Sequence, residues 1–142
     1  MDSRRIGSVG ELAVAARLAE LGFTVSWPLI EASYDLIAEK DGHIRRIQVK
    51  TASLNKGGSY RCSMKHCRSG TKGYDKSDCD FLILYAPFSK DFEDIMRDGY
   101  FIIPVGDIKA KIIFATVFPA GKGKGNIKVC KWEKYKDGWD KI

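Results

Sequence analysis

The pattern of apolar and polar residues predicts one N-terminal helix followed by several strands. Residues 8–21 repeat apolar side chains at helical spacing, contain several alanines, and end before Gly22, a common helix stop. After the helix, short runs of β-forming residues alternate with turn residues, which is typical of strands. The apolar positions of the helix are Val9, Leu12, Ala13, Ala16, Ala19 and Leu21, and the expected strands cover 23–27, 33–39, 44–51, 60–64, 80–86, 100–104 and 112–117.

Residues 34–50 have the pattern of a tight β-hairpin, with Asp-Gly at 41–42 between two alternating runs. A two-residue turn there would place Asp35 directly opposite Gln48 on the neighbouring strand. Because side chains alternate along a strand, Lys50 would share the face of Gln48, and the opposite face is apolar. The hairpin therefore predicts a polar cluster backed by a hydrophobic core.

Glu11 has two interpretations on sequence grounds. With Ser8 it forms an S-x-x-E capping box, in which its carboxylate would bond back to the start of the helix. Alternatively, it lies beside the apolar stripe and points across at the polar face of the hairpin. The pattern alone leaves both open.

The remaining segments complete an α/β arrangement in one domain, 1–142. The runs 80–86 and 100–104 are almost wholly apolar, as expected for strands buried on both faces. A mixed sheet with the first helix packed on one face is the simplest assembly. The other expectations are a loop at 53–59, a mobile segment at 65–76, a helical turn at 91–96 and a short final helix at 134–142 anchored by Trp139.

The charge balance favours a polyanionic partner. The chain has 24 basic and 18 acidic residues, a formal net charge of +6, and a lysine-rich flexible segment at 120–136. No run is apolar enough to span a bilayer and no signal-peptide core follows Met1, so we expect a cytoplasmic protein with no membrane partner. The cysteines would then be free thiols, namely Cys62, Cys67, Cys79 and Cys130.

A zinc site is one interpretation of Cys62, His66 and Cys67. The second half of a zinc-ligand pattern is missing, so an ordinary loop explains the same residues.

The polar face of the hairpin has the donor types of a hard-cation site. Asp35 and Gln48 carry oxygen ligands suited to Mg²⁺, and Lys50 could hold a water or stabilise charge on a phosphate. This combination, next to a basic surface, favours phosphodiester hydrolysis. Solvent-exposed polar residues on a hairpin are common, and they are the competing explanation.

Four positions in order resemble the PD-(D/E)xK nuclease superfamily: a helix Glu, a strand Asp, and QxK on the next strand. The opening is similar to archaeal Holliday-junction resolvases and to the QxK branch that includes homing endonucleases. The motifs are Gly7-Ser8-Val9-Gly10-Glu11-Leu12-Ala13, Tyr34-Asp35-Leu36-Ile37 and Ile47-Gln48-Val49-Lys50-Thr51, with looser similarity over 74–104.

This resemblance implies a restriction-endonuclease-like mixed central sheet with flanking helices, in which a three-strand meander follows the first helix. It implies that Asp35, Glu11, Gln48 and the Val49 backbone carbonyl hold Mg²⁺, or Mn²⁺ in its place. Lys50 would serve the nucleophilic water. Because Gln48 replaces the usual acid, the site has one negative charge fewer, and a weaker or single metal site is expected.

The functional alternatives left open are three. The first is a metal-dependent endodeoxyribonuclease that cuts a specific sequence, of homing or restriction type. The second is a structure-specific Holliday-junction resolvase, and the third is a non-catalytic nucleic-acid-binding module with the same fold. A homodimer or higher homo-oligomer is expected. The candidate phosphate contacts are Arg45, Arg46, Lys122, Lys124, Lys128 and Lys131.

Overall fold

The fold comes from a computed structural model, which describes residues 2–54, 60–65, 73–87, 99–108, 114–118 and 132–142. Its elements are α1 (Ser3–Glu20), β1 (Thr24–Ser26), β2 (Leu36–Lys40), β3 (His43–Thr51), β4 (Ser53–Leu54), β5 (Tyr60–Ser63), β6 (Phe81–Ala86), β7 (Gly99–Pro104) and β8 (Phe114–Phe118), with short 3₁₀ turns at Val105–Asp107, Glu133–Tyr135 and Trp139–Lys141.

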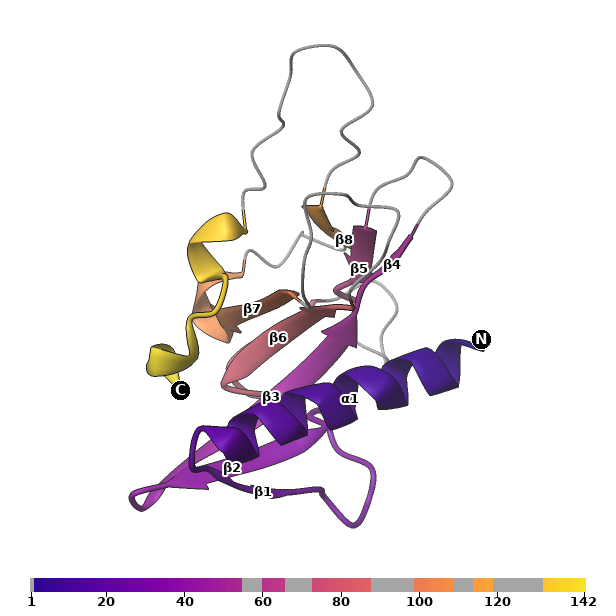
Figure 1. The fold of residues 1–142 in the computed structure, drawn as a ribbon. Coiled ribbons are helices and arrows are strands. Elements are labelled where there is room, and N and C mark those ends of the chain that lie inside the picture. The colour runs from indigo at the N-terminus through magenta and orange to yellow at the C-terminus, as the bar shows by residue number, and fades with distance from the viewer. Residues whose placement is uncertain (1, 55–59, 66–72, 88–98, 109–113, 119–131) are drawn as a thin grey trace.

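The main sheet has five strands in the order β1-β2-β3-β6-β7, and α1 lies across it (Figure 1). Strands β1 to β3 form an antiparallel meander, β6 runs parallel to β3, and β7 is antiparallel to β6. A smaller sheet of β4, β5 and β8 continues from the end of β3. This architecture confirms the predicted mixed α/β sheet with a meander after the first helix.

The hairpin has the predicted register. Lys40 pairs with His43, and both turn residues take positive φ, 51° at Asp41 and 78° at Gly42. Paired positive φ angles define the turn whose twist matches that of the flanking strands. The same register places Asp35 opposite Gln48, one residue beyond the last Leu36–Ile47 pair.

The helix begins earlier than predicted and buries a different face. Asp2 caps it by accepting a hydrogen bond of 2.9 Å from the Arg5 N–H, so Ser8 lies inside the helix and the predicted capping box with Glu11 is wrong. Its stop is confirmed, since Gly22 has a φ of 87°. The buried positions are Gly10, Val14, Ala15 and Leu18, whereas Val9, Leu12, Ala16 and Ala19 of the predicted stripe are exposed.

Each face of the main sheet has its own core. On the helix side, Ile83 of β6 packs with Leu18 and Ile47. On the other side, Leu82 and Leu84 pack with Tyr74 and aromatic residues of the C-terminal turns. Every residue of β6 is therefore buried, which explains its continuous apolar run and confirms it as a strand covered on both faces.

Several local predictions need correction or lie outside the described residues. Ser53–Leu54 is a strand rather than loop, because it pairs with β5. The C-terminal segment forms two 3₁₀ turns instead of one helix, although Trp139 is buried as predicted. The turn expected at 91–96 lies outside the described residues, as do most of 65–76 and of 120–136. No helix in the described part of the chain is long and apolar enough to cross a membrane.

Candidate active site

Asp35 is the residue that the other candidate side chains surround. It lies immediately before β2, where its backbone N–H donates to Ile47 O at 2.9 Å. Its carboxylate oxygen Oδ2 accepts from Gln48 Nε2 at 2.5 Å and from the Val49 N–H at 2.9 Å. The carboxylate is thus fixed at the edge of the sheet by the neighbouring strand.

The end of β2 leaves the backbone of Val49 without a strand partner on that side. In an antiparallel pair the N–H and C=O of one residue point to the same neighbour. The Val49 N–H is taken by Asp35, and its carbonyl oxygen accepts from Gln48 Nε2 at 3.2 Å. One amide nitrogen therefore lies between two oxygens that converge on it. Gln48 is buried, and it is the one buried polar or charged side chain among the described residues.

Glu11 approaches Asp35 from the helix. It lies roughly two turns from the start of α1, so its carboxylate is too far along the helix to cap the free N–H groups of the first turn. Partial burial and then repulsion from Asp35 raise the pKa of Glu11. Burial also raises the pKa of Asp35, and it outweighs the Val49 N–H and the charge of Lys50, both of which lower it. The two carboxyl groups form a like-charge pair that a bound cation would relieve.

Lys50 lies on the same side of β3 as Gln48. Its Nζ is 5.1 Å from the centre of the Tyr74 ring, a cation–π distance, and its charge acts on Asp35. Sequence reasoning gave Tyr74 no role, because its approach to Lys50 depends on a chain connection of more than twenty residues. The ring holds the ammonium near the carboxylate.

A close contact between α1 and β3 determines where Glu11 lies. A Cβ added at Gly10 would come within 1.9 Å of Thr51 Oγ1 and 3.3 Å of Tyr85 Cδ1. That oxygen is buried and has no hydrogen-bond partner among the described residues, so the close packing of the helix excludes water from it. The glycine allows the helix to touch the strand one residue away from Glu11.

The two arginines predicted to contact phosphate differ in their surroundings. Arg46 donates from NH2 to Asp80 Oδ1 at 3.2 Å and to Lys76 O at 3.0 Å, and from NH1 to Ser77 O at 3.1 Å. Partial burial alone would raise the pKa of Asp80, but the hydrogen bonds and charge of Arg46 hold it below its usual range. The guanidinium of Arg46 is occupied in fixing the residues before β6, whereas Arg45 donates only to the Ile44 carbonyl, at 3.3 Å, in the contacts described.

Of the three zinc candidates, Cys62 is the one that the structure describes. It is fully buried, and burial raises the pKa of its thiol to about 12. Its sulfur contacts Lys50 O at 3.7 Å, which is consistent with a packing role. Cys79 is also a buried free thiol. The remaining candidates from the sequence lie outside the described part of the chain. They are His66, Cys67 and Cys130, together with Lys122, Lys124, Lys128 and Lys131.

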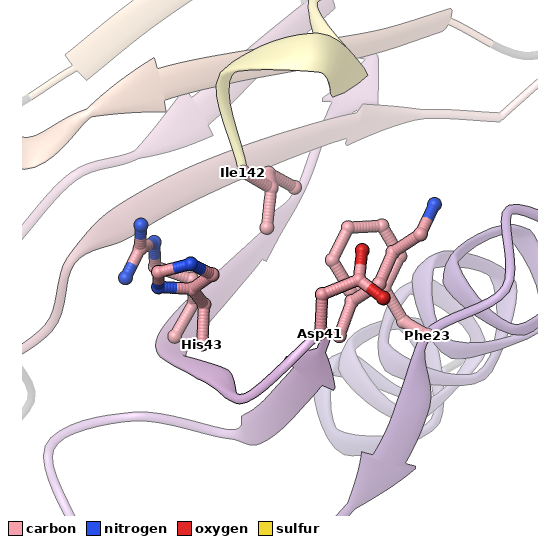
Figure 2. A pocket seen from close by; sticks show the side chains of 6 residues that line it. Phe23, Asp41, His43 and Ile142 are labelled. Atoms are coloured by element: carbon pink, nitrogen blue, oxygen red, sulfur yellow. The ribbon is translucent and has the colours of Figure 1, made fainter.

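A cavity of about 130 Å³ lies at the turn end of the hairpin, with Phe23, Asp41 and His43 around it and Ile142 on its far side (Figure 2). Lys40 and Arg45 complete its lining. Five residue pairs separate it from Asp35, roughly 17 Å along the strands. It is distinct from the carboxylate cluster, and its lining combines basic, acidic and apolar side chains.

Comparisons with known proteins show the family and the fold of the chain. The sequence profile of the PD-(D/E)XK endonuclease family matches residues 1–96, and the chain belongs to that family. Protein 5.3 of Escherichia phage T7 is 32% identical over 87 residues, which span 58% of this chain and 72% of that protein. The bacterial homing endonuclease I-Ssp6803I has the same fold, with a TM-score of 0.73 and 20% identity over 100% of this chain and 93% of its own.

The residues around Asp35 fit a divalent cation by their chemistry. Two carboxylates, a backbone carbonyl and an amide oxygen are the hard ligands that Mg²⁺ and Mn²⁺ prefer. The described residues contain no group of three or more His, Cys, Asp or Glu side chains that could hold a metal ion, so a cation here would rely on the neutral oxygens of Gln48 and Val49. The convergence of Asp35 Oδ2 and Val49 O on one polar atom supports that ligand set.

Proposed function

We propose that the protein is a metal-dependent endodeoxyribonuclease whose active site is the cluster around Asp35. The observation that carries this proposal is that the other three motif residues all act on Asp35. Gln48 bonds to its carboxylate, Glu11 is repelled by it, and Lys50 stabilises its charge. Solvent-exposed residues of a hairpin would show no such convergence from a helix and two strands.

The roles follow from position and charge. Asp35 and Glu11 would hold a Mg²⁺ or Mn²⁺ ion together with the Val49 carbonyl and the Gln48 amide oxygen. When bound, the ion would activate water and neutralise charge on the phosphate undergoing attack. Turning the Gln48 amide exchanges its NH₂ for its oxygen, so the same side chain can donate to the Asp35 carboxylate without metal and act as a ligand when metal is bound.

Lys50 has the charge and placement to orient the attacking water. Its ammonium lies over Tyr74 and close to Asp35, so a water beside Asp35 would have a donor opposite it. The same positive charge would favour the developing negative charge on phosphate oxygens. Arg45, on the hairpin, is available to contact the DNA backbone, and the lysines of 120–136 are further candidates.

The substrate is tested with a panel of supercoiled plasmid, linear duplex, flap and four-way junction in Mg²⁺. Cutting of plasmid or duplex supports the endonuclease, and preferential paired cuts in the junction would identify a resolvase, which is expected to act as a homodimer. A Lys50→Ala variant is the control. If it abolishes cutting and leaves DNA binding unchanged, the nuclease proposal stands; if the wild type binds every substrate and cuts none with either Mg²⁺ or Mn²⁺, the protein is a binding module.

A further inference from the structure

Three large apolar side chains in the loop between β1 and β2 lie in water. Leu29 is 101% exposed, Ile30 79% and Trp27 49%. Neither of the two cores includes them, so they contribute little to the stability of the fold. Neighbouring exposed apolar residues of this size indicate a surface that contacts another molecule.

Both ends of this loop are fixed by hydrogen bonds, and its second end lies beside the candidate active site. Ser26 pairs with Ile37 where the chain enters the loop. At the exit, Ser33 Oγ donates to Asp78 O at 2.8 Å, and Asp35 follows at the edge of the sheet. The loop extends beyond the strands on the side of the N-terminal half of α1, which carries Glu11 (Figure 1). Pro28 restricts the backbone between the exposed residues, which lowers the entropy cost of ordering them on a partner.

The reach of the chain sets the distance between the loop tip and the cleavage site. Leu29 lies six residues before Asp35, so at roughly 3.5 Å per residue the two are at most about 20 Å apart. B-form DNA rises about 3.4 Å per base pair. Any contact between the loop tip and a duplex cut at Asp35 would therefore lie within about six base pairs of the cut.

We propose that Leu29 and Ile30, with Trp27 beside them, form a wedge that enters the minor groove of bound DNA and unstacks a base step near the cut. This inference rests on the proposed function, since it takes DNA as the substrate. Branched aliphatic side chains are the residues that architectural DNA-binding proteins insert between base pairs, and an indole can stack on an exposed base. The loop tip therefore has the chemistry of an intercalating contact.

The size of the surface favours DNA over a second copy of the chain. A stable protein interface buries about 800 Å² on each partner and involves about 20 to 30 residues a side. Three side chains on one loop fall well short of that, whereas one or two are enough for a wedge between base pairs.

The test uses duplexes with 2-aminopurine at every fourth position, because the emission of this base rises when it is unstacked. A Lys50→Met background keeps the DNA intact. We expect emission to rise on binding, and the additional changes Leu29→Ser and Ile30→Ser to abolish the rise and weaken binding about tenfold. The matched control is Ile44→Ser, since Ile44 is 59% exposed on the same hairpin sheet but lies near the distant turn. It should leave both readings unchanged, and all variants should melt like the parent.

The outcomes separate the wedge from the nuclease. If the wild type cuts DNA but emission stays flat, or if the double variant gives the same rise, the wedge is wrong and the nuclease stands. If emission rises and no substrate is cut, the proposed function fails and the wedge stands. If sedimentation shows that Leu29→Ser with Ile30→Ser converts a dimer to a monomer, the loop is a subunit contact and the wedge is overturned.

Discussion

The Gln48 side chain donates a hydrogen bond of 2.5 Å from Nε2 to Asp35 Oδ2, directly across the β2–β3 hairpin. The amide therefore stands at the position where the (D/E)xK motif has an Asp or Glu carboxylate. It stabilises the metal-free cluster without adding charge. Under the proposed function, the site would fold without metal and would hold a cation with one negative charge fewer.

Replacing Gln48 by Glu should shift this balance. The variant loses the donor to Asp35 and gains a carboxylate beside that of Asp35, so its metal-free form should unfold more easily by about 1–3 kcal/mol. Its affinity for Mg²⁺ should rise, and isothermal titration together with melting in EDTA measures both effects. Gln48→Met, which has similar volume and no polar atoms, should bind Mg²⁺ more weakly than the wild type. Equal Mg²⁺ affinity in all three proteins would show that residue 48 is not a ligand.

Gly10→Ala should destabilise the fold by about 1–3 kcal/mol, because its methyl group would overlap Thr51 Oγ1. Cleavage should fall as well, since the shift of α1 moves Glu11. Gly7→Ala is the matched control: no atom in the described part of the chain lies within 4 Å of its added Cβ, so the change should stabilise α1 by up to about 1 kcal/mol. Chemical denaturation measures both.

The double variant Gly10→Ala with Thr51→Ala tests the cause. Removing the hydroxyl should restore most of the lost stability and activity. If the stability loss of the double variant equals the sum of the losses of the two single variants, the contact does not set the position of the helix.

The raised pKa values of Glu11 and Asp35 predict an unusual pH dependence in EDTA. A carboxyl group whose pKa is higher in the folded state binds its proton more tightly there. The free energy of unfolding therefore falls as pH rises from about 4 through the raised pKa, and it levels off above that value. Relative to Asp35→Asn, the wild type should lose melting temperature between pH 4 and pH 8.

Saturating Mg²⁺ should remove this loss at neutral pH, because binding to the folded form adds stability. A difference between the two proteins that stays constant from pH 4 to pH 8 would contradict the like-charge pair.

Arg45 and Arg46 should give opposite results although they are adjacent. Arg46→Gln breaks the ion pair with Asp80. Both side chains of this pair are about one third exposed, and the change should lower the free energy of unfolding by about 1–2 kcal/mol. Arg45→Gln should leave melting unchanged, weaken DNA binding and lower the salt dependence by about one counterion. Titrations at several salt concentrations measure this slope. If Arg46→Gln melts like the wild type and binds DNA more weakly than Arg45→Gln, then Arg46 is the DNA contact and the two roles are reversed.

The hairpin and its polar pair could be predicted because the determining interactions are local. An Asp-Gly turn sets the register, and the register sets which side chains face each other. The family's order of motif residues then indicated Glu11, although its neighbours suggested a cap. Asp2 provides the cap instead, and the sequence pattern did not reveal this.

The buried face of α1 could not be predicted in the same way. Apolar residues lie on both sides of this helix, so the pattern favours neither Leu12 nor Leu18. The contact of Gly10 with Thr51 decides it, and that contact joins residues forty-one positions apart. The role of Tyr74 beside Lys50 likewise depends on tertiary packing, while the lysines of 120–136 remain predictions.

The most direct test of the metal-dependent site is single-turnover cleavage of supercoiled plasmid by the wild type and Asp35→Asn, each with Mg²⁺ and with EDTA. We predict that the wild type cuts only with Mg²⁺ and that Asp35→Asn is slower by at least about a hundredfold, while its DNA binding is retained. Cutting by the wild type in EDTA, or wild-type rates in Asp35→Asn, would contradict the account.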